Sequence, residues 1–162
     1  MRRIYIVFVM VIVFTTSGCT MNTYRTSEIS EYGSYKSTII YDYLESFPDK
    51  EVVNKSINCN YEYRYRGTLF YDDQCIYIWC EYSEEDYISE IERLNISHGE
   101  YDTVLFDLPA YVFIYDDICY EYAIIDDENR TIHYIYIQYL TDLCEDAGIP
   151  YLPQKSADIY VY

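Results

Sequence analysis

Residues 61–66 read Tyr-Glu-Tyr-Arg-Tyr-Arg, with an aromatic ring at every second position and a charged side chain between. Side chains of a strand alternate between its two faces, so this pattern predicts a half-buried strand with one aromatic and one charged face. Gly67 fits a bulge or turn, and Asp72-Asp73 fits a turn before a second β run over 75–80. The stretch is therefore expected to hold two successive strands.

Four further strands are expected downstream. They lie at 103–106, 111–115, 118–125 and 131–140, and Leu108-Pro109, Asp116-Asp117 and residues 126–130 separate them. Such short polar connections predict an antiparallel meander. Residues 159–162 are a candidate edge strand.

Two amphipathic helices are expected beside the strands. Apolar residues recur at helical spacing over 34–47, and Pro48 supplies a stop. Ser83 is placed as an N-cap, with Asp86 three residues later and an apolar stripe that ends near Gly99. The predicted fold class is α+β, with one antiparallel sheet of about five to six strands packed by two amphipathic helices.

The size and charge of the chain limit its function. A length of 162 residues with 51% hydrophobic residues predicts one folded domain. The formal net charge of −17 argues against nucleic acid and anionic lipid headgroups as partners, because both repel an acidic surface. Cations, neutral glycans and basic proteins remain open as partners.

Tyrosine is unusually frequent, with 24 copies against 6 Phe and 1 Trp. One interpretation is structural, since tyrosine is a good strand former with a polar tip. The other is a tyrosine-lined face that stacks on sugars or binds a protein, because tyrosine is enriched at interfaces.

The N-terminus has the pattern of an export signal. Arg2 and Arg3 precede an apolar run over 4–14, and small uncharged residues over 15–18 lead to Cys19. The apolar run is shorter than the roughly twenty residues that a transmembrane helix needs.

The residues Thr16-Ser17-Gly18-Cys19 resemble a bacterial lipobox, although an aliphatic residue is usual where Thr16 stands. The resemblance implies cleavage before Cys19, lipid on its thiol (with palmitate as one acyl chain), and a protein held on the extracytoplasmic side of the cell membrane. The expected organisation is a signal peptide over 1–18, a lipidated N-terminus and polar tether over 19–27, and one α+β domain over 28–162. Alternatives are an ordinary signal peptide with a chance cysteine and an uncleaved membrane anchor.

The organisation of the mature domain is similar to that of uncharacterised small lipoproteins of A+T-rich Gram-positive bacteria. That resemblance implies no particular activity.

Five cysteines follow Cys19, namely Cys59, Cys75, Cys80, Cys119 and Cys144. Up to two disulfides can form among them in an oxidising envelope, or all five can be reduced. Cys75 and Cys80 are placed on opposite faces of one strand and should not bond to each other. Cys59 and Cys75 would face each other if the hairpin turned at 66–68.

No motif predicts a catalytic, cofactor or metal site. No two cysteines have C-x2-C spacing, and the histidines, His98 and His133, lie apart in the sequence, which disfavours zinc. Acidic clusters lie at 72–73, 84–86, 116–117 and 126–128, but none has the spacing of a calcium loop. Phosphate-binding loops and serine-hydrolase elbows are absent from the sequence.

These observations predict a lipid-anchored, non-catalytic binding or interaction module that meets an envelope protein, a glycan or a cation. The alternatives are a small envelope hydrolase that uses paired carboxylates or a cysteine nucleophile, and a structural or immunity-type lipoprotein. Convergent carboxylates, or a cysteine beside His98 or His133, would favour the hydrolase.

Overall fold

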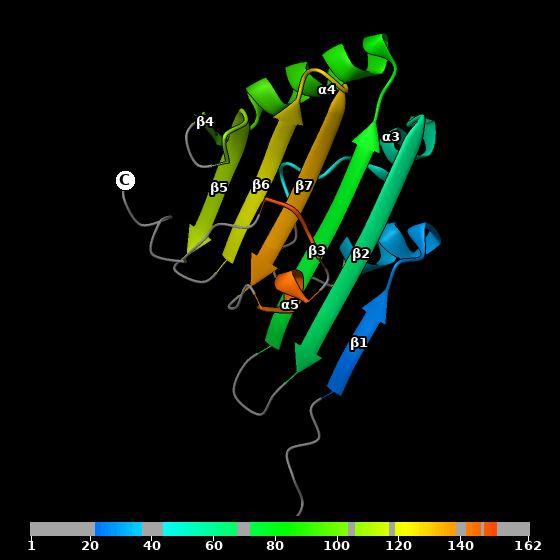
Figure 1. Ribbon diagram of the computed structural model, residues 1–162, viewed down its shortest axis with the longest axis vertical. Helices are drawn as coiled ribbons and strands as arrows, with labels where there is room; N and C mark the ends of the chain where they lie inside the picture. The colour runs from blue at the N-terminus through cyan, green and yellow to red at the C-terminus, as the bar shows by residue number, and fades with distance from the viewer. Residues whose placement is uncertain are drawn as a thin grey trace, which may run out of the picture.

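The computed structural model describes residues 22–36, 44–67, 72–103, 106–116, 119–138, 142–146 and 148–151. These residues form one antiparallel sheet of seven strands with helical segments on both faces (Figure 1). The strands are β1 (Asn22–Thr26), β2 (Asn58–Gly67), β3 (Asp72–Glu81), β4 (Glu100–Asp102), β5 (Ala110–Asp116), β6 (Cys119–Asp126) and β7 (Thr131–Gln138). The helices are η1 (Ile29–Glu31), α2 (Tyr32–Lys36), α3 (Lys50–Lys55), α4 (Glu84–Ile96) and α5 (Asp142–Glu145). The predicted α+β class with an antiparallel sheet is confirmed, but the strand number and the helices differ in detail.

The strand order in the sheet is β1-β2-β3-β7-β6-β5-β4. The meander β5–β6–β7 was expected from its short connections, and β2 and β3, expected as successive strands, pair as a hairpin. Helix α4 carries the chain from β3 in the middle of the sheet to β4 at its far edge. The chain then returns strand by strand until β7 pairs with β3. The centre of the sheet therefore joins segments that are far apart in the sequence.

The hairpin β2–β3 confirms the predicted alternation but corrects its turn. Tyr61 and Tyr63 are buried on one face of β2. The last paired residues are Gly67 and Asp72, so Asp72-Asp73 belongs to β3 and the predicted turn at these aspartates is wrong. The reason is electrostatic, because the buried Asp73 carboxylate lies opposite Arg66 and accepts a hydrogen bond of 2.7 Å from its Nε.

Both outer strands differ from the sequence expectation. Residues 22–26, expected within a polar tether, instead form β1, which pairs with β2 over its whole length. The strand expected at 103–106 is displaced to Glu100–Asp102, where pairing with β5 sets Tyr101 opposite Tyr111. Phe106 is instead a buried turn residue whose ring meets that of Tyr122 edge-on at 5.0 Å. The candidate strand at 159–162 lies outside the described residues, as do residues 104 and 105.

Helix α4 forms as its sequence predicts. Ser83 is the N-cap, and its hydroxyl accepts a hydrogen bond of 3.2 Å from the backbone N–H of Asp86. Tyr87 and Leu94 are buried against the sheet, whereas Ile88 on the outer side is exposed. Local capping and an apolar stripe are sufficient to define this helix.

The helix predicted over 34–47 is confirmed at residues 34–36, which belong to α2, and is wrong at residues 44–47. Helix α2 ends at Lys36, residues 37–43 lie outside the described part, and residues 44–47 are irregular and largely buried. Arg93 of α4 donates a hydrogen bond of 2.8 Å to the carbonyl of Glu45 and another to that of Ser46. The backbone N–H of Ser46 donates at 2.6 Å to the buried Glu121. Glu121 thus takes the Ser46 N–H, which a helix over 34–47 would pair internally. Arg93 binds two carbonyls that the last turn of such a helix would leave unpaired.

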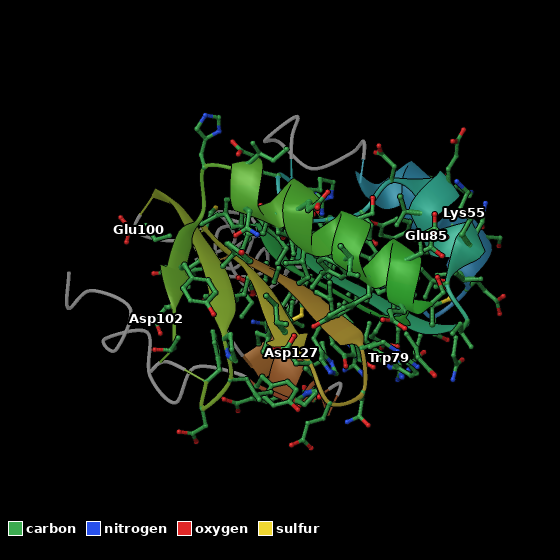
Figure 2. All side chains as sticks on the ribbon, turned by 90° about the horizontal axis from the view of Figure 1, so that it is seen from above. Lys55, Trp79, Glu85, Glu100, Asp102 and Asp127 are labelled. Atoms are coloured by element: carbon green, nitrogen blue, oxygen red, sulfur yellow. A yellow bond between two sulfur atoms is a disulfide. The ribbon has the colours of Figure 1, made fainter. Side chains whose placement is uncertain are left out.

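The sheet is covered on both faces (Figure 2). One face carries α4, together with α2, α3 and residues 44–47, over a core rich in buried tyrosines. Helix α5 and residues 106–110 and 149–151 lie on the other face, over a second core. A disulfide from Cys75 in β3 to Cys144 in α5 joins this second layer to the sheet. Within the described residues, no helix has the length and apolar character needed to cross a bilayer.

Candidate binding pocket

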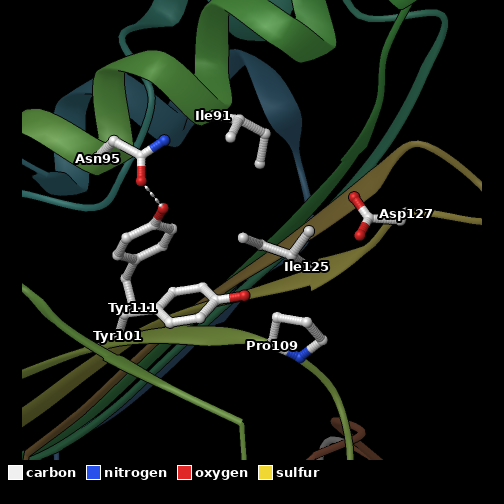
Figure 3. Close-up of a pocket in the computed structure, with 7 residues that line it drawn as sticks. All are labelled: Ile91, Asn95, Tyr101, Pro109, Tyr111, Ile125 and Asp127. Atoms are coloured by element: carbon white, nitrogen blue, oxygen red, sulfur yellow. Dashed lines mark hydrogen bonds between the residues drawn. The ribbon is translucent and has the colours of Figure 1, made fainter.

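A pocket of about 260 Å³ lies where the C-terminal half of α4 overhangs the sheet near its β4 edge (Figure 3). Its position follows from the α4 crossover, which lays the helix across the ends of β5 and β6. The lining side chains are Ile91, Asn95, Tyr101, Pro109, Tyr111, Ile125 and Asp127. The two tyrosines lie at one end and Asp127 at the other, with the apolar side chains between them.

The aromatic end of the pocket is built by the pairing of β4 with β5. The rings of Tyr101 and Tyr111 meet in a T-shaped contact with centroids 5.3 Å apart. The Tyr111 hydroxyl donates a hydrogen bond to Oδ1 of Asn95, which ties β5 to α4. Burial, with a smaller effect of Tyr101, raises the pKa of Tyr111, so this hydroxyl remains a neutral donor. Tyr101 is 59% exposed and offers its ring to solvent and to any ligand.

The acidic end of the pocket is the turn between β6 and β7, which was predicted over 126–130. Asp127 is exposed there, and its Oδ1 accepts a hydrogen bond of 2.6 Å from the hydroxyl of Tyr87 in α4. Burial, together with this hydrogen bond, raises the pKa of Tyr87 and keeps its hydroxyl protonated. Within the described part of the chain, no arginine or lysine forms an ion pair with Asp127.

The cysteines follow a pairing that spacing alone did not predict. Cys75 bonds to Cys144, whose Cα lies 5.9 Å away. Cys75 does not bond to Cys80, as expected, but it also does not face Cys59. Because the β2–β3 turn lies beyond Gly67, Cys59 lies opposite Cys80. Cys119 accepts a hydrogen bond from the Tyr136 hydroxyl, and Cys19 lies outside the described residues.

The two histidines have separate environments. His133 is a strand residue, as predicted, and its Nδ1 shares a hydrogen bond of 2.9 Å with the Tyr77 hydroxyl. Burial lowers the pKa of His133. His98 is exposed beyond α4 and contacts Glu45. The described interactions of neither histidine include a cysteine.

Three of the acidic clusters lie on separate described elements, at 72–73 in β3, at 84–86 in α4 and at 126–128 where β6 enters the β6–β7 turn. Among the residues that the structure describes, no three Asp, Glu, His or Cys side chains are grouped as metal ligands would be. The cluster at 84–86 forms the first turn of α4, where carboxylates are favoured by the helix dipole. Of the predicted clusters, the one at 126–128 contributes to the pocket, through Asp127.

The tyrosine excess serves mainly the interior. Among the largest side chains that are fully buried are Tyr32, Tyr61, Tyr82, Tyr122, Tyr134 and Tyr136. Tyr24 on β1 and Tyr101 on β4 are exposed, at opposite edges of the sheet. The structural interpretation therefore accounts for most of the described tyrosines, and Tyr101 is the exposed one that lines the pocket.

This pocket was not predicted from the sequence. Pro109 and Asp127 were interpreted as parts of connections, and no part in a binding site was predicted for Asn95 or Tyr101. The comparisons add no site either, because no family model matches the chain and no curated protein or solved structure matches it.

Proposed function

We propose that the protein is a lipid-anchored, non-catalytic binding module that takes its ligand in the pocket between α4 and strands β4–β6. The observation that carries the proposal is the pocket itself, in which an exposed aromatic ring, an apolar floor and an unpaired carboxylate face one space. Such a concave site with a few polar groups is the usual form of a small-ligand site. The ligand is either a small molecule or a protruding group of an envelope polymer or protein.

The position of the pocket supports this proposal. Asn22, the first described residue, lies at one end of the sheet, whereas α4 and the β6–β7 turn lie at the opposite end (Figure 1). Lipid on Cys19 would be only a few residues from Asn22. The membrane would then adjoin the end remote from the pocket, and the pocket would open toward the exterior.

The pocket is tested with a variant that fills it. The full-length protein, solubilised in detergent, is heated with calcium, cell-wall fragments, glycans and organic amines, since a ligand of the folded state raises the melting temperature. Ile91→Trp places an indole in the pocket, and Ile88→Trp places the same ring on the exposed side of α4. A ligand of the pocket should stabilise the wild type and Ile88→Trp but not Ile91→Trp. Equal stabilisation of all three proteins would place binding elsewhere.

The anchor is tested separately. Cells that express the wild type, Cys19→Ala or Cys59→Ala are grown with a clickable fatty-acid analogue. We expect label on the wild type and on Cys59→Ala, and none on Cys19→Ala, which should also leave the membrane fraction or fail to mature. Retained labelling of Cys19→Ala would refute the anchor.

A further inference from the structure

We propose that the ligand of this pocket carries a protonated amine, which pairs with Asp127 while its apolar body packs on Ile125, Pro109 and Tyr101. The inference rests on the proposed function and specifies the chemical class of the ligand.

The charge of the pocket lining favours a cationic ligand. Of the seven lining residues, Asp127 alone carries a formal charge at neutral pH. Tyr87 donates to its Oδ1, and no described residue donates to its Oδ2. This oxygen can therefore accept a charge-assisted hydrogen bond from an ammonium group. An anionic ligand would be repelled by this carboxylate and by the net charge of −17 that the whole chain carries.

The surroundings reinforce the preference for a cation. Tyr101, at the opposite end of the pocket, is flanked on β4 by Glu100 and Asp102 (Figure 2). Their side chains alternate to the face of β4 opposite Tyr101, but both carboxylates add to the net charge of −17, which attracts cations at longer range.

The remaining polar groups argue against a neutral sugar. Recognition of a sugar requires several donors and acceptors that converge on its hydroxyls. Here the Tyr111 hydroxyl and the Asn95 carbonyl oxygen already bind each other, which leaves the Tyr101 hydroxyl and the Asn95 amide nitrogen as the other side-chain polar groups of the lining besides Asp127. Ile91, Ile125 and Pro109 form the apolar part of the lining between the two ends. The pocket thus matches a ligand with one cationic end and an aromatic or aliphatic body.

The test compares two probes of nearly the same shape. 2-Phenylethylamine is protonated at neutral pH, and 2-phenylethanol is neutral. Isothermal titration of the full-length protein in non-ionic detergent, with empty micelles as blank, should show the amine binding about fivefold more tightly, as expected for one exposed charge pair. Asp127→Asn should abolish this preference. Glu128→Gln removes a charge from the same turn outside the pocket lining and should preserve it.

The outcomes separate the amine inference from the pocket. Equal binding of the two probes, binding of neither, or a preference that survives Asp127→Asn overturns the amine inference. If the neutral probe binds and Ile91→Trp prevents that binding, the pocket function stands and only the ligand class is wrong. If Ile91→Trp leaves the binding of every ligand unchanged, the pocket function fails as well. Titration with Nα-acetyl-lysine amide then distinguishes a lysine side chain from a free amine as the source of the ammonium.

Discussion

Glu90 in α4 is a buried carboxylate whose charge is balanced within the fold. Arg93 donates hydrogen bonds to both carboxylate oxygens of Glu90, from Nε to Oε2 at 2.9 Å and from Nη2 to Oε1 at 2.6 Å. The Tyr134 hydroxyl donates to Oε1 at 2.8 Å. The same guanidinium holds the carbonyls of Glu45 and Ser46. One arginine therefore neutralises a buried acid and fixes the irregular segment beside it.

Arg93→Met should lower the free energy of unfolding by about 2–3 kcal/mol, because it removes the cationic partner of the buried Glu90. The loss is smaller than for a wholly buried pair, since 34% of the Arg93 side chain is exposed. Chemical denaturation measures it, with the exposed Arg130→Met as the control. The double variant Glu90→Gln with Arg93→Met should recover part of the loss. A single variant within ~0.5 kcal/mol of the wild type would refute this role.

His133 should make the stability depend on pH. Its pKa in the folded protein is lowered by burial, so below the ordinary value of about 6.5 the unfolded chain binds a proton that the folded chain does not. The stability that His133 contributes is thus complete above this pH and is lost as the pH falls through it. His133→Gln should show a smaller loss of unfolding free energy between about pH 7.5 and pH 5.5 than the wild type. His98→Gln is the comparison variant. If the unfolding free energy of His133→Gln depends on pH as strongly as that of the wild type, His133 is not the source of the pH dependence.

At the scale of elements, α4 matters most because it both covers the core and builds the pocket. Ser83→Ala removes the acceptor for the Asp86 N–H and should cost about 1 kcal/mol of stability. Ser89→Ala, at an exposed position within the same helix, is the matched control. Thermal and urea denaturation of both variants give the difference. Equal stabilities would mean that the cap adds nothing to the helix in this protein.

Elements defined by neighbouring residues could be predicted from the sequence, and elements defined by distant partners could not. Alternation over 61–66 and the cap at Ser83 are local signals, and both correspond to observed elements. The segment 44–47 has helical spacing, yet Arg93 and Glu121 hold it in an irregular form. The pocket was missed for the same reason, because its lining comes from α4, β4, β5, β6 and two connections that only the fold brings together.

At the scale of the whole molecule, the disulfide closes a loop with a sequence separation of 69. For a loop of this length, the disulfide is expected to stabilise the fold by about 4 kcal/mol, because it lowers the conformational entropy of the unfolded chain. Cys144→Ala should lower the free energy of unfolding by roughly 2–4 kcal/mol. Added reductant should destabilise the wild type by a similar amount and leave the variant unchanged. If reductant destabilises Cys144→Ala as well, another disulfide contributes.

The central position of β7 determines when the protein can fold during its synthesis. The ribosome releases β2 and β3 early, but the partner of β3 on its inner side is β7, the last strand in the described part of the chain. Until residue 138 has emerged, β3 is an unpaired edge, and such edges template aggregation. A nascent chain of this protein therefore has to be kept from self-association for nearly its whole length. Premature termination before β7 should yield insoluble fragments rather than a smaller folded domain.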